Sequence, residues 1–143
     1  MSEARPRIIL DTNVLLVSIS SRSRFHWIFR DLLAGRFDLL ISNEILSEYE
    51  EIISKKFSPE VATEVARTLI LLPNVEEIHP AYRWKLITAD PDDDKFVDCA
   101  VAGNAQAIVT EDRHFRVLNE LDFPPVRPMS IEGFRALLEA VDR

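Results

Sequence analysis

The sequence contains very little cysteine and glycine. Of its 143 residues, one is cysteine and three are glycine. The single Cys99 excludes an internal disulfide, and so few glycines argue against a disordered or low-complexity chain. No apolar run approaches the roughly 20 residues that a membrane-spanning helix needs, and no secretory leader follows Met1. We therefore expect one soluble domain over residues 1–143, located in the cytoplasm and not in a membrane.

Positive charge is also scarce. Lys and Arg number 17 against 24 Asp and Glu, which gives a net charge of −7. This charge argues against a protein that holds nucleic acid by bulk attraction to its phosphates. Acids gathered at a metal site, however, are neutralised by the cations that they bind. The sign of the net charge therefore does not decide whether nucleic acid is a substrate.

Short apolar runs alternate with helical patterns along the chain. The runs predict strands at 7–10, 37–41, 75–78 and 107–109, and an edge strand at 126–128. Cap residues and apolar stripes predict helices that begin near residues 25, 43, 59, 92 and 130. This alternation is typical of an α/β domain with a mostly parallel sheet covered on both faces. Ligands of such sheets bind beyond the carboxyl ends of the strands.

Two acids follow directly on predicted strands. Asp11 comes after the strand at 7–10, and Asp112 comes shortly after the strand at 107–109. Either residue could cap a following helix, since Asp is among the best N-cap residues. Two acids at two strand ends are less readily a coincidence than one, and both can face the same crevice.

The most acidic stretch of the chain is residues 90–94. Its first acid and the following proline suit a helix start, and we assign Asp92 and Asp93 to the first turn, where the helix dipole favours them. Asp94 and Asp98 form an i, i+4 pair of like charges, which repel by a few tenths of a kcal/mol in water. A cation near the pair would remove this repulsion, and a solvated helix face is the alternative.

On the helix that begins near residue 43, Glu48 and Glu50 lie at opposite edges of the apolar stripe. Helical geometry does not choose between them as the residue that faces the predicted crevice.

Four segments in order carry a family resemblance. They are Ile-Ile-Leu-Asp11-Thr12-Asn13, Ser47-Glu48-Tyr49, Asp90-Pro-Asp-Asp-Asp94-Lys-Phe and Ala107-Ile-Val-Thr110-Glu-Asp112. With these segments the chain resembles the PIN-domain family of metal-dependent ribonucleases, in particular its stand-alone bacterial toxins of toxin–antitoxin pairs. The resemblance covers about residues 7–140 and implies a three-layer α/β/α sandwich with a central, mostly parallel sheet.

The resemblance implies an acidic metal site and favours Glu48 over Glu50. Its metal-binding and catalytic residues would be Asp11, Glu48, Asp94 and Asp112. Asp98 stands where some relatives have a further acid and is an additional candidate metal ligand. The residues that would orient carboxylates or water are Thr12, Asn13 and Thr110. Because Asp92 and Asp93 crowd Asp94, the register of the third acid stays open, and the helix start favours Asp94.

An all-oxygen ligand set favours Mg²⁺ or Mn²⁺, and neither Cys99 nor the three scattered histidines have the spacing of a zinc site. The expected reaction is hydrolysis of RNA phosphodiester bonds. Candidate phosphate contacts are Arg22, Arg24, Lys95, Arg113 and Arg116. The resemblance also implies an antitoxin partner and a homodimer, for which the apolar side chains Phe25, Trp27 and Phe29 are candidates that suit a core equally well.

Two other functions compete with a nuclease. One is a non-catalytic PIN-like module that binds RNA or a protein, which the presence of all four acids disfavours. The other is an aspartyl-phosphate protein that uses Asp11 as its nucleophile. Residues 11–13 do not form an Asp-x-Asp pair, and no lysine follows a suitable later strand, so this alternative is also disfavoured.

Overall fold

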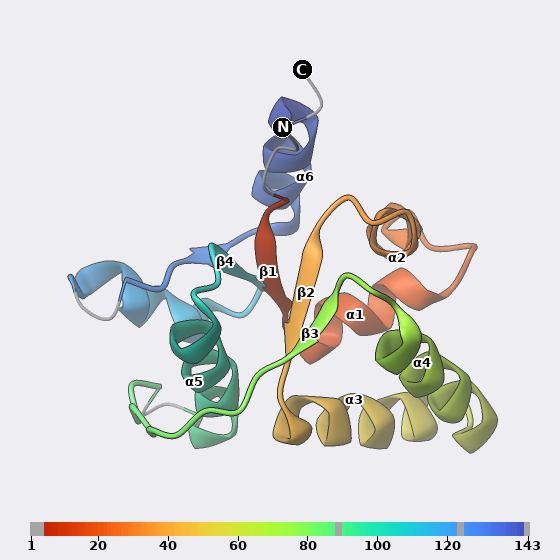
Figure 1. The fold of residues 1–143 in the computed structure, drawn as a ribbon, viewed down its shortest axis with the longest axis horizontal. Coiled ribbons are helices and arrows are strands. Elements are labelled where there is room, and N and C mark those ends of the chain that lie inside the picture. The colour runs from red at the N-terminus through yellow and green to blue at the C-terminus, as the bar shows by residue number, and fades with distance from the viewer. Residues whose placement is uncertain (1–4, 88–89, 123–124, 142–143) are drawn as a thin grey trace.

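The computed structural model describes residues 5–87, 90–122 and 125–141. Its centre is a five-stranded sheet with the strand order β3-β2-β1-β4-β5 (Figure 1). The strands are β1 (Arg7–Leu10), β2 (Asp38–Ile41), β3 (Val75–Glu77), β4 (Ala107–Val109) and β5 (Pro128–Met129). Adjacent strands are parallel throughout, and helices flank the sheet. The predicted α/β/α sandwich is confirmed.

The helices follow the start signals in the sequence. They are α1 (Thr12–Ile19), α2 (His26–Leu33), α3 (Asn43–Lys56), α4 (Pro59–Leu71), α5 (Asp94–Gly103) and α6 (Ile131–Val141), with short 3-10 helices η1 (Pro91–Asp93) and η2 (Arg113–Glu120). The hydroxyl of Ser42 caps α3, and that of Ser58 caps α4, which confirms both predicted starts. Within the described ranges, no helix has both the length and the apolarity to cross a membrane.

Two elements differ from the sequence prediction. The helix expected from about residue 92 begins as the 3-10 turn η1, and its α-helical part starts only at Asp94. The edge strand expected at 126–128 lies instead at Pro128–Met129. It pairs there because Ile108 donates to the carbonyl of Arg127 and Thr110 donates to that of Met129, so Pro128 needs no N–H of its own.

The order of the strands brings two sequence-distant strand ends together. The chain passes from β1 to β2 and β3 on one side and later enters β4 on the other side of β1. Leu10 is paired with Val109, and the N–H of Asp11 donates to the carbonyl of Val109 at 3.0 Å. The residues that follow β1 and β4 therefore meet at the point where the strand order reverses, which is where open α/β sheets bind ligands.

The apolar side chains of α2 belong largely to the core. Phe25, Trp27 and Phe29 are partly buried against the core cluster, and the Trp27 ring lies 5.8 Å from the ring of Phe134 on α6. Of the two roles considered for these residues, packing within the chain is therefore the one that the structure shows.

Candidate metal centre

Asp11 lies at the carboxyl end of β1, where it precedes α1. It is 6% exposed and occupies the N-cap position of α1, as one alternative predicted, but its side chain makes no capping hydrogen bond there. The hydroxyl of Thr110 donates to Asp11 Oδ2 at 2.7 Å. Burial raises the pKa of the Asp11 carboxyl, and the bond from Thr110 opposes that rise only in part. A negative charge at Asp11 is therefore costly in the protein alone.

Glu48 reaches the same region from α3. The hydroxyl of the neighbouring Tyr49 is buried and donates to the carbonyl of Leu10 at 2.5 Å, which holds α3 against the end of β1. Glu48 Oε2 accepts a hydrogen bond from the hydroxyl of Thr12. Glu50, the other edge of the apolar stripe, is exposed. Of the two glutamates, the structure therefore brings Glu48 to the carboxyl end of β1.

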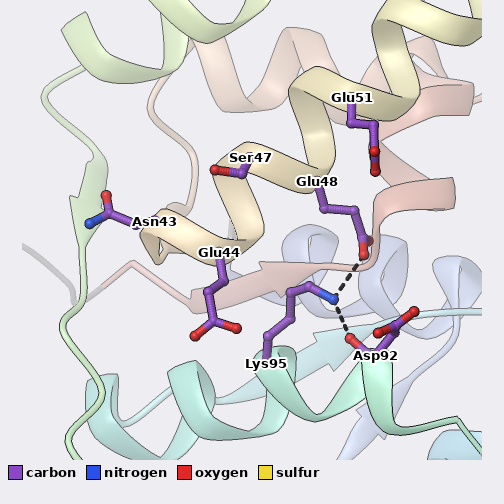
Figure 2. A pocket seen from close by; sticks show the side chains of 7 residues that line it. All are labelled: Asn43, Glu44, Ser47, Glu48, Glu51, Asp92 and Lys95. Atoms are coloured by element: carbon purple, nitrogen blue, oxygen red, sulfur yellow. Dashed lines mark hydrogen bonds and ion pairs between the residues drawn. The ribbon is translucent and has the colours of Figure 1, made fainter.

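A cation of the protein also contacts Glu48. Lys95 extends from α5 and places its Nζ 2.8 Å from Glu48 Oε1 (Figure 2). The same ammonium group donates to the carbonyl of Asp92, and its side chain is only 13% exposed. Lys95, expected as a phosphate contact, is thus engaged with Glu48 and η1.

Asp112 follows β4 and combines two roles. Its Oδ1 accepts the N–H of His114 at 2.9 Å, so Asp112 caps η2. This capping role is one of the two alternatives that the sequence left open. Its own N–H donates to Thr110 Oγ1 at 3.0 Å. Because the same Thr110 hydroxyl donates to Asp11, this threonine joins the two acids at the strand ends. The orienting role expected of Thr110 fits these contacts.

A fourth acid near this group is Asp93, which the sequence analysis assigned to a helix start while leaving the register against Asp94 open. Its side chain makes no capping bond to α5, and its Oδ2 is buried with no hydrogen-bond partner among the described residues. Burial, followed by the charges of Asp90, Asp11, Asp112 and Glu48, raises the pKa of Asp93 to about 7. Asp93 therefore shares one electrostatic environment with the acids from β1, α3 and β4.

Asp94 and Asp98, the predicted metal ligands on α5, contact a different part of the chain. Asp94 Oδ1 accepts the N–H of Ile87 at 2.8 Å, and Asp98 Oδ1 accepts the N–H of Trp84 at 2.9 Å. The like-charge pair is therefore stabilised by two backbone donors. The sequence analysis favoured Asp94 as the third acid of the metal site. In the structure the 3-10 turn ends at Asp93, and Asp94 faces the segment at 84–87.

One histidine lies beside the acids, and sequence reasoning missed it. Asp90, Asp93 and His114 each place one potential ligand atom within 4.8 Å of those of the other two. His114 Nδ1 also lies 3.4 Å from Asp112 Oδ1. The signal in the sequence is the spacing Asp112-Arg-His114, which places the histidine one short turn after the acid that caps η2.

Two pockets border the acids. One, with a volume of about 560 Å³, is lined by Glu48, Lys95 and Asp92 together with residues of α3 (Figure 2). The other, of about 380 Å³, is lined by Asp11, Asn13 and Asp112 together with apolar side chains that include Phe25. The acidic residues thus lie where ligand could approach from two sides, and Asn13 lines the space next to Asp11.

The predicted phosphate contacts are spread around these pockets. The guanidinium of Arg24 lies 4.7 Å from the centre of the Phe25 ring. Arg113 and Arg116 line a smaller pocket of about 200 Å³ with Thr110 and Asp112. Arg22 is exposed in the loop after α1.

A comparison with protein families identifies the family of this domain. The model of the PIN domain matches residues 7–114. The chain belongs to the PIN-domain family. PIN domains are generally nucleases. No curated protein sequence is significantly similar to this one.

Two solved structures share the PIN fold with this chain. One is VapBC2 from Rickettsia felis bound to a DNA fragment from their promoter, with a TM-score of 0.58, 21% identity and coverage of 87% of this chain and 98% of that one. The other is the RRP44 PIN domain of T. brucei, with a TM-score of 0.53, 10% identity and coverage of 96% and 83%. At these identities the likeness supports the fold alone.

The acids of this PIN domain suit a hard divalent cation. Asp93 Oδ2 lacks a hydrogen-bond donor in the described structure, and the pKa values of Asp11 and Asp93 are both raised. A bound cation would supply the missing partner and reduce the repulsion between the carboxylates. Cys99 offers no thiolate, because it is buried in the core and burial raises its pKa to about 12. Carboxylate oxygens thus dominate the ligand set, as Mg²⁺ and Mn²⁺ prefer.

Proposed function

We propose that this PIN domain is a divalent-metal-dependent endoribonuclease that hydrolyses RNA phosphodiester bonds. Its metal-binding and catalytic acids are Asp11, Glu48, Asp93 and Asp112. The observation that carries the proposal is the buried, unpartnered oxygen of Asp93 in an acidic group that two neighbouring strand ends and α3 complete. Mg²⁺ or Mn²⁺ bound there would lower the pKa of a water and stabilise charge on the attacking and leaving oxygens.

Hydrogen bonds and an ion pair within the chain fix the orientation of Asp11 and Glu48. Thr110 orients Asp11 through a 2.7 Å hydrogen bond, and Thr12 holds one oxygen of Glu48. Lys95 holds the other oxygen of Glu48 and thereby links α3 to η1. A carboxylate that is already oriented loses little side-chain freedom when it takes up a cation.

Asp94 and Asp98 are left out of the proposed ligand set. The resemblance favours both as metal ligands, but each contacts the segment at 84–87, and neither is among the carboxylates whose charges raise the pKa of Asp93. These two bonds hold the segment at 84–87 against α5. We assign both acids a positioning role.

The proposed biological role is that of the toxin in a toxin–antitoxin pair. It is supported by the resemblance to stand-alone bacterial PIN toxins and by the fold shared with VapBC2. Arg113 and Arg116, which line a pocket with Asp112, and Arg24, which lies over the ring of the pocket residue Phe25, are the proposed phosphate contacts. An antitoxin partner, a homodimer and a cytoplasmic location stay predictions.

A cleavage assay tests the enzymatic proposal. Labelled single-stranded and hairpin RNAs are incubated with the protein and Mg²⁺ or Mn²⁺, with and without EDTA. We expect cleavage that EDTA abolishes and that Asp11→Asn reduces by at least about 100-fold, a typical loss when charge stabilisation at a reacting phosphate is removed. Glu64→Gln, at an exposed position on α4, is the matched control and should cleave at the unmodified rate.

Two results would count against the proposal. Equal cleavage by the unmodified protein and Asp11→Asn would mean that the acids assigned here are not the catalytic site. RNA binding without turnover in either metal would favour the alternative of a non-catalytic RNA-binding module.

A further inference from the structure

Three side chains from two separate segments meet on one flank of the acidic group. Asp90 precedes η1, Asp93 ends it, and His114 is the second residue of η2. Their potential ligand atoms lie within 4.8 Å of one another. This separation is short enough for one ion to contact all three, since bonds from a divalent cation to oxygen or nitrogen measure about 2.0 to 2.6 Å.

The position of His114 is defined by its backbone. Its N–H donates to Asp112 Oδ1 at 2.9 Å, and Nδ1 of its ring lies 3.4 Å from the same oxygen. A carboxylate next to a ring nitrogen is the usual means of orienting a histidine that binds metal through its other nitrogen. The imidazole is 40% exposed, so an ion from solvent can reach it.

Within this group, Asp93 is the residue whose hydrogen bonding is incomplete in the described structure. Its buried Oδ2 has no hydrogen-bond partner in the described part of the chain, whereas Asp90 already accepts the N–H of Asp92 with its Oδ1. A buried carboxylate oxygen without a donor costs free energy, which a cation would recover.

We propose that His114 is a nitrogen ligand of the divalent cation that Asp93 holds, with Asp90 as an additional ligand, and that the site consequently prefers Mn²⁺ to Mg²⁺. The inference rests on the proposed metal site and extends it to a residue outside the acidic set. Mg²⁺ binds oxygen ligands almost exclusively, while imidazole suits transition-metal ions. A single histidine therefore shifts the selectivity of the centre without altering its acids.

Metal binding tests this inference without any activity measurement. Untagged protein is titrated with MnCl₂ and with MgCl₂ by isothermal calorimetry, and the Mn²⁺ complex is studied by pulsed electron paramagnetic resonance. We expect tighter binding of Mn²⁺ and ¹⁴N modulation from a coordinated imidazole. His114→Ala should remove that modulation and weaken Mn²⁺ binding by at least about tenfold, with less than about threefold effect on Mg²⁺.

His79→Ala is the matched control, because His79 also lies next to a carboxylate, that of Glu77, but 74% exposed and outside the acidic group. It should bind both metals as the unmodified protein does. The ¹⁴N measurement on the unmodified protein needs no variant, so the test does not depend on the folding of His114→Ala. An Mn²⁺ complex without ¹⁴N modulation, or unchanged Mn²⁺ affinity in His114→Ala, would overturn the inference and leave His114 only as a neighbour of Asp112.

The outcome is separable from that of the proposed function. Nitrogen-coordinated Mn²⁺ in a protein that cleaves no RNA would support the role of His114 and count against the nuclease. Metal-dependent cleavage with no ¹⁴N signal would support the nuclease and overturn the role of His114.

Discussion

Acidic side chains at the start of α5 divide into two sets that meet different partners. Asp93 lies with Asp11 and Asp112 at the carboxyl end of the sheet, and one of its oxygens is buried with no donor among the described residues. Asp94 and Asp98 face the segment at 84–87, where each accepts a backbone N–H. Asp93 and Asp94 are adjacent in sequence, yet of the two only Asp93 has a buried oxygen without a donor in the described part of the chain.

The difference also appears in the electrostatics. Burial raises the pKa of Asp98, but the N–H of Trp84 opposes that rise. For Asp93 no donor opposes burial, and four neighbouring carboxylates add to it, so its pKa reaches about 7. Asp98 thus has a backbone donor for its carboxylate, whereas the buried oxygen of Asp93 has none among the described residues and is available to an external cation.

The largest expected effect separates the two neighbours directly. Asp93→Asn should lower the rate of metal-dependent RNA cleavage by about 100-fold, because it removes a charge from the proposed metal site. Asp94→Asn should lower it by less than about fivefold, since the amide oxygen can still accept the N–H of Ile87. Initial rates at saturating Mg²⁺ give the comparison, with circular dichroism as the test of folding. A greater loss in Asp94→Asn would restore the register that the sequence favours.

A smaller effect, on the free energy of unfolding, is expected when Asp98 of the second set is replaced. Asp98→Ala removes the acceptor of the Trp84 N–H and should lower the free energy of unfolding by about 1 to 3 kcal/mol in urea denaturation. Asp98→Asn keeps an acceptor and serves as the control, with a smaller loss. Mg²⁺ affinity should be unchanged in the folded Asp98→Ala protein. A variant of normal stability that binds no metal would instead place Asp98 in the metal site.

The smallest expected effect concerns the free-energy cost of ionising Asp93 in the folded protein. Its folded-state pKa of about 7 lies above the ordinary 3.8, so ionisation disfavours the folded state. This cost is absent below about pH 4, grows between pH 4 and 7, and is complete above pH 7. In EDTA at pH 8, Asp93→Asn should therefore raise the free energy of unfolding by about 1 kcal/mol, a value reduced for solvent screening.

The same measurement at pH 5.5 should show a smaller gain, since Asp93 is then mostly protonated in the folded protein. Asp92→Asn, at the exposed neighbouring position, is the matched control and should show little change at either pH. A loss of stability in Asp93→Asn at pH 8 would mean that its carboxylate has a favourable partner after all.

Most of the fold could be predicted because its signals are local. Mostly apolar segments at 7–10, 37–41 and 107–109 predicted three strands, and 75–78 predicted a weaker fourth. Ser42 or Asn43 and then Ser58 predicted two helix starts, which the caps at Ser42 and Ser58 confirm. The edge strand was displaced because its position depends on which carbonyls face β4, a pairing that local composition does not encode. The 3-10 turn at Pro91–Asp93 was also missed, although it changes the orientation of only a few residues.

The site was predictable where acids follow strands and less so on α5. Asp11 and Asp112 were expected to face one crevice, and the structure joins them through Thr110. The choice between Asp94 and Asp93 stays a prediction to be tested, and the contacts of the two residues favour Asp93, because the 3-10 turn ends there and Asp94 contacts Ile87. His114 was set aside because histidines scattered in sequence have no ligand spacing, yet η2 brings one of them back to Asp93.

Local chemistry along the chain was enough to establish an α/β sandwich, its helix caps and the presence of acids at strand ends, since each depends on neighbouring residues. Which acids meet was decided only by packing. Strand order set β1 beside β4, Tyr49 drew α3 to the end of β1, and backbone donors from residues 84–87 occupied Asp94 and Asp98. Contacts between separate segments thus decide which acids gather at the ends of β1 and β4 and which contact residues 84–87, and only the folded chain makes those contacts.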